Sequence, residues 1–299
     1  MKRRNFITAT SLTLGLLATS NKNALASIFS ESKYQFKPLR NNVGIFTQQG
    51  GTIGWLNSSD GFVVVDAQFP TTAPNVIAEL KKMGTKSFTH LINTHHHGDH
   101  TAGNIAFKDL VGSVVAHNNS LFNQKESAKK QGNEQNQLFP DTVFTQSWAL
   151  KLSDESIKAH YFGAAHTNGD AIIHFENANI AHMGDLVFNR RFPFIDKTAG
   201  ADIAHWIIVL QKALDTFDDD TLFVFGHSLD PDKITGSKSD IKAFQNYLQS
   251  LLDLVGEKIK AKQSLEEILK IKTIPGAPEW KGDGIERSLN AAFEELKKS

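Results

Sequence analysis

The chain has 299 residues, in which 32 Lys and Arg balance 32 Asp and Glu, and it contains 12 His and no Cys. Its 40% hydrophobic and 21% charged residues are typical of a globular protein with one large domain or two small ones. The zero net charge argues against a nucleic-acid binder, whose surface normally carries a basic excess. Because there is no Cys, disulfides and thiolate ligands are excluded, and any bound metal must be held by His and carboxylates.

The first 26 residues are typical of a signal peptide. A charged start precedes an apolar stretch from Ile7 to Ala18, and a small-x-small cleavage pattern follows. The pair Arg3 and Arg4 lies in a context that resembles a bacterial twin-arginine signal, which implies export of a folded protein by the twin-arginine machinery. We therefore expect a signal peptide over residues 1–26 and a periplasmic mature chain over 27–299. No later apolar run reaches the ~20 residues that span a bilayer, so no stable membrane insertion is expected after cleavage.

The mature chain alternates strand-like and helical segments, separated by turn sequences rich in Gly, Ser and Asp. The expected strands are 43–47, 52–57, 62–66, 88–93, 111–116, 143–145, 149–152, 157–161, 171–175, 180–183 and 222–225. The expected helices are 74–83, a surface helix within 118–137, 203–217 and most of 239–271. This interleaving, without a break in composition, predicts one layered α/β domain with a helical C-terminal segment from about residue 239.

A cluster of histidines follows one of the expected strands directly. His95 and His97 project from the same side of a tight segment, and Asp99 and His100 follow where the chain can turn them toward a second centre. Loops at strand ends are where rigid scaffolds carry functional groups. Four such residues at this spacing indicate a metal site, whereas a single His would more simply be structural. His96 lies between the ligands and is expected to point away.

The segment from Thr94 to Asn104 resembles the signature of the metallo-β-lactamase superfamily. Three later segments resemble the further ligand motifs of that family in the right order, namely 162–170, 183–188 and 223–228. The early strand that ends at Asp66 also matches the family's strand with an Asp beneath the site. The resemblance covers most of the mature chain, and it implies a four-layer αββα sandwich in a single domain.

The resemblance also implies two metal centres made of imidazoles and carboxylates. The ligands of the first centre would be His95, His97 and His166. The ligands of the second would be Asp99, His100 and His227, with Asp185 bridging the centres or leaning on the second. This set suits two Zn²⁺ ions, although iron or manganese would also accept it. A metal-bridged hydroxide would attack an ester, thioester, lactone or amide carbonyl, and Asp99 would orient it and relay its proton to the leaving group.

The third motif departs from the pattern of many β-lactamases in this family. Those enzymes have Cys where this chain has Asp185, and a Lys three residues later where it has Phe188. Cleavage of β-lactams is therefore an alternative that the sequence does not favour. Arg190 and Arg191 are candidates for a bidentate contact with an anionic substrate group, or else a solvated pair. Candidates for an apolar pocket wall are Phe69, Trp148, Phe192 and Phe194.

Two further classes of protein are alternatives to a hydrolase. A mononuclear iron sulfur dioxygenase of the same fold would need only the first three ligands, so the complete second set disfavours it. A non-catalytic metal-binding protein would be expected to lack ligands, and none is missing. Nuclease activity conflicts with the neutral charge and the export signal. We therefore expect a small-molecule substrate and no nucleic-acid partner.

Overall fold

Two β-sheets form the centre of the fold in the computed structural model, which describes residues 33–298. The first sheet has the strand order β1-β2-β3-β4-β5-β6-β7. Its strands are β1 Gln35–Arg40, β2 Val43–Thr47, β3 Ile53–Ser58, β4 Gly61–Val65, β5 Phe88–Ile92, β6 Val111–His117 and β7 Thr142–Phe144. Strands β1 to β4 pair antiparallel, and β4 to β7 pair parallel. The expected signal peptide, residues 1–26, lies outside the described residues.

The second sheet has the order β15-β13-β11-β10-β9-β8. Its strands are β8 Ser147–Lys151, β9 Ser156–His160, β10 Ile172–Phe175, β11 Ile180–His182, β13 Leu222–Val224 and β15 Thr235–Gly236. All neighbours are antiparallel except β11 and β13, which are parallel. A separate ribbon joins β12, Phe188–Asn189, to β14, His227–Ser228. Because β9, β11 and β13 run in one direction, the loops that follow them all emerge at the same edge of this sheet.

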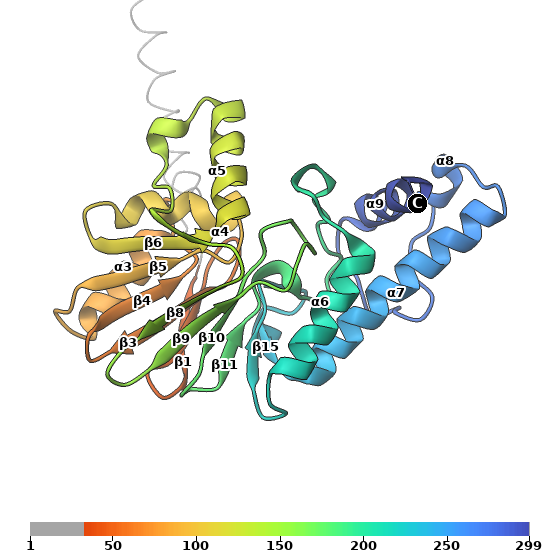
Figure 1. The fold of residues 1–299 in the computed structure, drawn as a ribbon. Coiled ribbons are helices and arrows are strands. Elements are labelled where there is room, and N and C mark those ends of the chain that lie inside the picture. The colour runs from red at the N-terminus through yellow and green to blue at the C-terminus, as the bar shows by residue number, and fades with distance from the viewer. Residues whose placement is uncertain (1–32, 299) are drawn as a thin grey trace, which may run out of the picture. The chain divides into compact units, whose positions relative to one another are not determined.

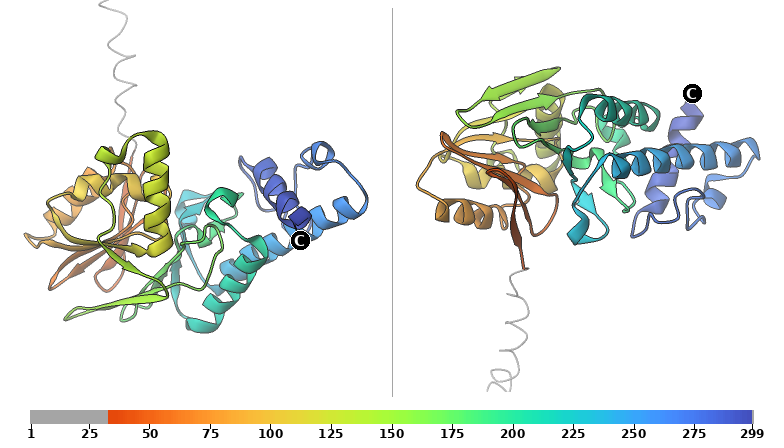
Figure 2. Two further views of the ribbon diagram at one scale, coloured as in Figure 1. Left: turned by 45° about the horizontal axis from the view of Figure 1, so that its top comes forward. Right: turned by 90° about the horizontal axis from the view of Figure 1, so that it is seen from below.

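Helices cover the outer faces of both sheets (Figures 1 and 2). On the first sheet lie α3 Ala73–Lys82, α4 Gly98–Thr101 and α5 Asn118–Gln131, and on the second lie α6 Ile203–Thr216 and α7 Lys238–Lys260. The short 3₁₀ helices are η1 Ala102–Phe107, η2 Glu134–Asn136, η3 Gly184–Leu186, η4 Lys197–Ala199 and η5 Pro231–Lys233. The four-layer α/β sandwich in one domain that the sequence predicts is therefore confirmed.

The side chains of β4 show why the layers stack in this way. Val63 and Val65 are fully buried in the core between the two sheets, while Val64 is fully buried in the core beneath α3. Alternate residues of a strand point to opposite faces, so a strand that is covered on both faces is apolar along its whole length. On α3, Val76 and Leu80 supply the facing side chains at a helical spacing of four.

Most observed elements begin and end within two residues of the expected ones, and their boundaries have local causes. Helix α3 has a Pro in its first turn, where the missing N–H would have had no partner in the helix. Helix α5 ends at Gly132, which adopts a left-handed φ of 64° and donates its N–H to carbonyls of the last turn. The expected surface helix and loop within 118–137 correspond to α5 and η2.

The C-terminal segment contains α7, a short helix α8, Leu265–Ile268, and a final helix α9, Ile285–Lys298. Helix α9 is attached to the loop that precedes α6. Glu295 accepts hydrogen bonds from the N–H groups of Ile203 and Ala204, both at 2.9 Å, and pairs with Lys197 at 2.7 Å. This carboxylate satisfies donors in the first turn of α6, which otherwise have no partner in the helix. None of the helices within residues 33–298 is long and apolar enough to cross a membrane.

Candidate metal centre

The seven predicted ligand residues lie together at one edge of the sandwich, each in a segment that follows a strand. Residues 95–100 follow β5, and His166 lies in the loop between β9 and β10. Asp185 lies in η3 after β11, and His227 begins β14 after β13. The common direction of β9, β11 and β13 brings the last three residues to the same edge of the second sheet.

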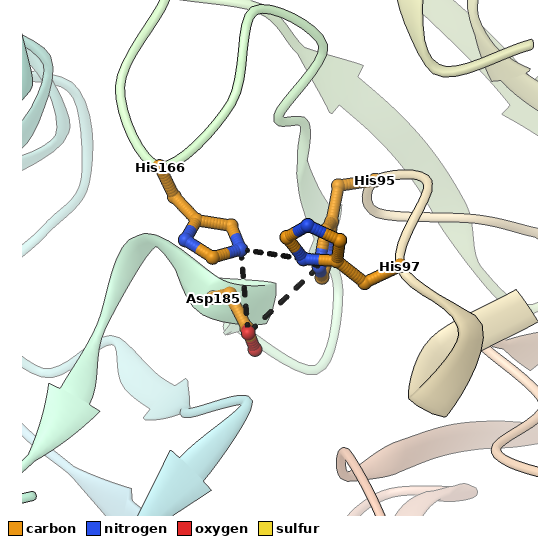
Figure 3. A group of neighbouring side chains, drawn as sticks. All are labelled: His95, His97, His166 and Asp185. Carbon is orange, nitrogen blue, oxygen red and sulfur yellow. Dashed lines mark hydrogen bonds and ion pairs between the residues drawn. The ribbon is translucent and has the colours of Figure 1, made fainter. Parts of the chain in front are cut away.

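The first group comprises His95, His97, His166 and Asp185 (Figure 3). His97 Nδ1 lies 3.1 Å from His95 Nε2 and 2.9 Å from His166 Nε2. Asp185 Oδ2 lies 3.8 Å from His95 Nε2 and 3.5 Å from His166 Nε2. Three ring nitrogens and one carboxylate oxygen thus point at a common centre (Figure 3).

The hydrogen bonds of the opposite ring nitrogens determine which nitrogens face that centre unprotonated. His166 Nδ1 lies 2.7 Å from the carbonyl oxygen of Phe194, which can only accept, so Nδ1 carries the hydrogen and Nε2 presents a lone pair. His97 Nε2 lies 2.9 Å from Asp196 Oδ2 and donates to it, so Nδ1 presents a lone pair. When both rings are neutral, two lone pairs therefore face each other at 2.9 Å, and a cation between them would satisfy both.

The same reasoning applies to His95. The Thr94 hydroxyl donates to Asp66 Oδ2 at 2.7 Å, so it accepts from His95 Nδ1 at 3.1 Å. Nε2 of His95 then presents the third lone pair that is directed at the centre. Burial lowers the pKa of His95 well below its usual value, and it lowers the pKa of His166 to about 3. Both imidazoles are therefore neutral at physiological pH, as metal ligands must be.

The second group comprises Asp99, His100 and His227. His227 Nε2 lies 3.1 Å from Asp99 Oδ2 and 3.4 Å from Asp185 Oδ1, and His100 Nε2 lies 3.0 Å from the same Asp185 oxygen. Asp185 thus directs Oδ2 at the first group and Oδ1 at the second. His100 Nδ1 donates to Asp66 Oδ2 at 2.8 Å, so Asp66 fixes the orientation of this ring from beneath.

The carboxylates control the protonation of the second group. Burial alone would lower the pKa of His100, but Asp185, Asp99 and Asp66 outweigh it and raise that pKa well above its usual value. The pKa of His227 is raised to about 9, because Asp185 and Asp99 outweigh its burial. Burial would raise the pKa of Asp185, yet His227, His100 and His95 hold it well below its usual range. Concentrated negative charge of this kind is stabilised by bound cations.

Two glycines leave room for these ligands. A Cβ atom at Gly51 would overlap the ring of His100, and one at Gly226 would overlap the carboxylate of Asp185. The N–H of Gly51 donates to the carbonyl of Asp99 at 3.0 Å, and that of Thr52 donates to the carbonyl of Gly226, also at 3.0 Å. The turn before β3 is therefore packed directly against the second group and fixes its position.

The residues present fit divalent metal ions. His100 Nε2 and Asp185 Oδ1 are buried 3.0 Å apart as an ion pair, and neither atom makes a hydrogen bond among the described residues. A buried polar atom without a hydrogen bond is costly, and a metal ion would satisfy both atoms. The donors are imidazole nitrogens and carboxylate oxygens, the set preferred by Zn²⁺ and accepted by iron and manganese.

The sequence reasoning missed Asp196, which is the N-cap residue of η4. Its Oδ1 accepts hydrogen bonds from the N–H groups of Thr198 and Ala199 at 3.0 and 3.1 Å, while Oδ2 accepts from His97. A carboxylate that holds the outer nitrogen of a ligand His fixes both the ring and its tautomer. His96 contributes to neither group, and its Nε2 lies 3.6 Å from Asp196 Oδ2. The Asp-x-Thr pattern signals a turn, but nothing in the sequence links that turn to His97.

A cavity of about 320 Å³ opens over both groups, and its lining includes His97, Asp99, Asp185 and His227. The other lining side chains that matter for recognition are Phe188, Arg191, Phe192, Phe194, Asp283 and Arg287. Of the four aromatic residues that were candidates for a pocket wall, Phe192 and Phe194 line the cavity, whereas Phe69 and Trp148 do not.

The two arginines that were candidates for a substrate contact differ in their positions. Arg191 is exposed and lines the cavity. Arg190 does not line it, because its guanidinium lies 4.7 Å from the ring centre of Trp280 and 3.6 Å from Asp240. Arg190 also adopts a left-handed φ of 58°, which turns consecutive side chains to different sides. The sequence did not identify Arg287, which belongs to α9 and has no recognisable motif around it.

The fold and the site define an α/β sandwich protein with a candidate centre of His and Asp ligands at one edge of its sheets. The profile of the metallo-beta-lactamase superfamily matches residues 47–227, and the chain belongs to this family. The match contains all seven predicted ligands and ends at His227.

Two curated relatives resemble part of the chain. A metallo-beta-lactamase type 2 of Bacillus sp. (strain 170) is 28% identical over 179 residues, which are 60% of this chain and 66% of that protein. A hydroxyacylglutathione hydrolase of Erythrobacter litoralis (strain HTCC2594) is 32% identical over 139 residues, which are 44% of this chain and 50% of that protein. In both cases the chain spans less than two thirds of the length of the relative.

Solved structures support the same fold. The DIM-1 metallo-beta-lactamase superposes with a TM-score of 0.61 at 17% identity, over 73% of this chain and 98% of that one. A metallo-beta-lactamase from Pontibacter korlensis superposes with a TM-score of 0.58 at 17% identity, over 73% of this chain and 99% of that one. At these identities the likeness concerns the fold alone.

Proposed function

We propose that this member of the metallo-beta-lactamase superfamily is a metal-dependent hydrolase that holds two divalent ions, Zn²⁺ by preference, and cleaves an ester, thioester, lactone or amide. The observation that carries the proposal is the convergence of three imidazole lone pairs beside a complete second ligand group. Imidazoles arranged in this way bind a cation and have no evident structural purpose.

Each ligand has a defined place in this proposal. His95, His97 and His166 would hold the first ion, and Asp99, His100 and His227 the second, with one oxygen of Asp185 directed at each. Bound divalent ions would lower the pKa of water and polarise the carbonyl that is attacked. The walls of the cavity, Phe188 and Phe194 among them, would exclude bulk water from the reacting groups.

Asp99 is the residue placed to handle the proton. Burial would raise its pKa, but the charge of His100 and the hydrogen bond from His227 lower it to about 2. The carboxylate is thus ionised at every working pH, and it faces the cavity. Asp99 would orient the attacking water and pass its proton to the leaving group.

The place of action proposed for this enzyme is the periplasm, reached through the twin-arginine machinery. The support is the pattern of the first 26 residues, with paired arginines, an apolar stretch and a cleavage motif. A ligand set without Cys suits this compartment, because His and Asp do not form disulfides in an oxidising environment.

Cleavage of β-lactams is the second candidate, favoured by the relative that is named a metallo-beta-lactamase. Two positions argue against it, since Asp185 and Phe188 stand where many lactamases of this family have Cys and Lys. A mononuclear iron dioxygenase is disfavoured, because it would need only the first three ligands and would leave the complete second group without a role.

The proposal is tested by counting metal ions on purified mature protein and assaying hydrolysis of 4-nitrophenyl esters, acyl-glutathione thioesters, homoserine lactones and nitrocefin. We expect two zinc ions per chain and hydrolysis of at least one non-lactam substrate. Asp99→Asn should reduce that hydrolysis by about a hundredfold or more, the usual range for loss of a proton-transfer group. The matched control is Asp109→Asn, an exposed site with no side-chain partner. One iron and no zinc, or full activity of Asp99→Asn, would refute the assignment.

A further inference from the structure

One wall of the cavity comes from the C-terminal segment, which lies beyond the region matched by the family profile. Backbone pairing brings this segment to the site. The N–H of Lys281 donates to the carbonyl of Arg190 at 3.0 Å, and the N–H of Phe192 donates to the carbonyl of Lys281 at 3.2 Å. Asp283 and Arg287 come two and six residues after Lys281, and both line the same cavity as the candidate metal ligands.

The backbone before α9 is shaped to accommodate Arg287. Gly284 has a φ of 112°, and a Cβ atom there would lie 3.0 Å from Nη2 of Arg287. Glycine at this position therefore gives the guanidinium the room it occupies. On its other side the guanidinium lies over the ring of Phe194, 5.6 Å from the ring centre. This contact holds the charge beside an aromatic face at the mouth of the cavity.

The positive charge at the rim is not neutralised. Within the described part of the chain, the guanidinium groups of Arg191 and Arg287 take part in no ion pair and no hydrogen bond. Arg190 differs in both respects, since it forms an ion pair with Asp240 and donates a hydrogen bond to Asn189 Oδ1 at 3.2 Å. Beyond the candidate metal ligands, the charged side chains that line the cavity are two cations, Arg191 and Arg287, and one carboxylate, Asp283.

We propose that Arg287, together with Arg191, binds a carboxylate of the substrate, so that the enzyme acts on small acyl compounds with a free carboxylate. The inference deepens the proposed function and rests on it. A guanidinium binds a carboxylate through two parallel hydrogen bonds, and the apolar part of the acyl chain would lie on Phe194. A cavity of about 320 Å³ is at the small end of ligand pockets and limits the size of such a substrate.

The first test uses two esters that differ only in charge. 4-Nitrophenyl hemiglutarate ends in a carboxylate, and 4-nitrophenyl 5-methylhexanoate has an isopropyl group of similar shape at that position. We expect the zinc-loaded protein to prefer the hemiglutarate by about tenfold in kcat/KM at low ionic strength. Arg287→Gln should remove most of this preference and leave hydrolysis of the neutral ester within about twofold. Lys81→Gln, which removes an exposed cation on α3, is the control and should change neither rate.

The second test measures binding without turnover. Calorimetry on the zinc-loaded protein compares benzylsuccinate with 3-phenylpropanoate, which lacks only the second carboxylate arm. We expect benzylsuccinate to bind about tenfold more tightly to the wild type and to the Lys81→Gln control, and Arg287→Gln to reduce this advantage to about twofold.

The outcomes distinguish a failure of the carboxylate subsite from a failure of the proposed hydrolase function. If neither ester is hydrolysed but the benzylsuccinate advantage depends on Arg287, the hydrolase proposal fails for esters and the carboxylate subsite stands. If both esters are hydrolysed and Arg287→Gln changes neither the ester preference nor the binding difference, the hydrolase stands and the carboxylate subsite is refuted. An equal effect of Lys81→Gln would also refute it, because the preference would then reflect overall charge.

Discussion

Asp196→Asn is expected to weaken the first metal site while leaving the fold intact. In the variant the amide oxygen still accepts from Thr198 and Ala199, so the cap of η4 is retained. The amide nitrogen then faces His97 Nε2, where the carboxylate accepted at 2.9 Å. A donor in this position favours the tautomer of His97 with its hydrogen on Nδ1, pointing at the lone pairs of the neighbouring rings.

Loss of such a supporting carboxylate typically reduces metal affinity 10- to 100-fold, which corresponds to about 1.4–2.7 kcal/mol. The assay is competition between the protein and a fluorescent zinc chelator, with circular dichroism as a check on the fold. Asp230→Asn is the matched control, because Asp230 caps η5 in the same way and lies outside the site. Wild-type affinity in Asp196→Asn would refute the assignment of tautomers on which the metal site rests.

Three other perturbations have defined outcomes. Gly226→Ala should displace the Asp185 carboxylate and lower the metal content by at least one ion per chain in elemental analysis. Gly98→Ala, which has open space around the added Cβ, should bind as much metal as the wild type, and equal metal content in the two variants would contradict the geometry. Chelation should lower the melting temperature by about 5–10 °C, since a free ion at 100 times its Kd contributes about 2.7 kcal/mol, and an unchanged melting temperature would argue against structural coupling. Burial, then Lys158 and His174, lower the pKa of His160 to about 4. The unfolded chain therefore binds a proton that the folded chain does not, and folding stability is lost as pH falls from about 6.5 toward 4. In urea titrations, the free energy of unfolding of His160→Gln should fall by about 1 kcal/mol less between pH 7 and pH 5 than that of the wild type, after allowance for the partial exposure of the ring. An equal fall in both proteins would refute the lowered pKa.

The strands of the two sheets were predictable because their apolar runs are local signals. Strand β4 is apolar at five consecutive positions, and the helical spacing in α3 is equally clear. Strand β1 was not predicted, because it lies at the edge of its sheet, has no fully buried side chain and contains Pro38. The two-residue strands β12, β14 and β15 exist only through their pairing, which no local pattern encodes.

The seven candidate ligands could be brought together from the sequence for a different reason, since each stands in a short motif at the end of a strand. The residues that support or surround them were harder to find. Asp196 reaches His97 across 99 positions of sequence, and Arg287 lies 60 residues beyond the last ligand motif. Helix α9 itself has apolar Ile285, Leu289 and Ala292 at helical spacing, so its existence could have been predicted, although its position at the cavity could not.

The separation along the chain between the metal ligands and the wall carrying Arg287 has an evolutionary consequence. The ligands end at His227, whereas Asp283 and Arg287 belong to the final segment of the chain. Under the proposed carboxylate subsite, substitutions in the final segment would change which molecules bind and leave the candidate metal ligands in place. Selection would then act on substrate preference and on metal binding separately.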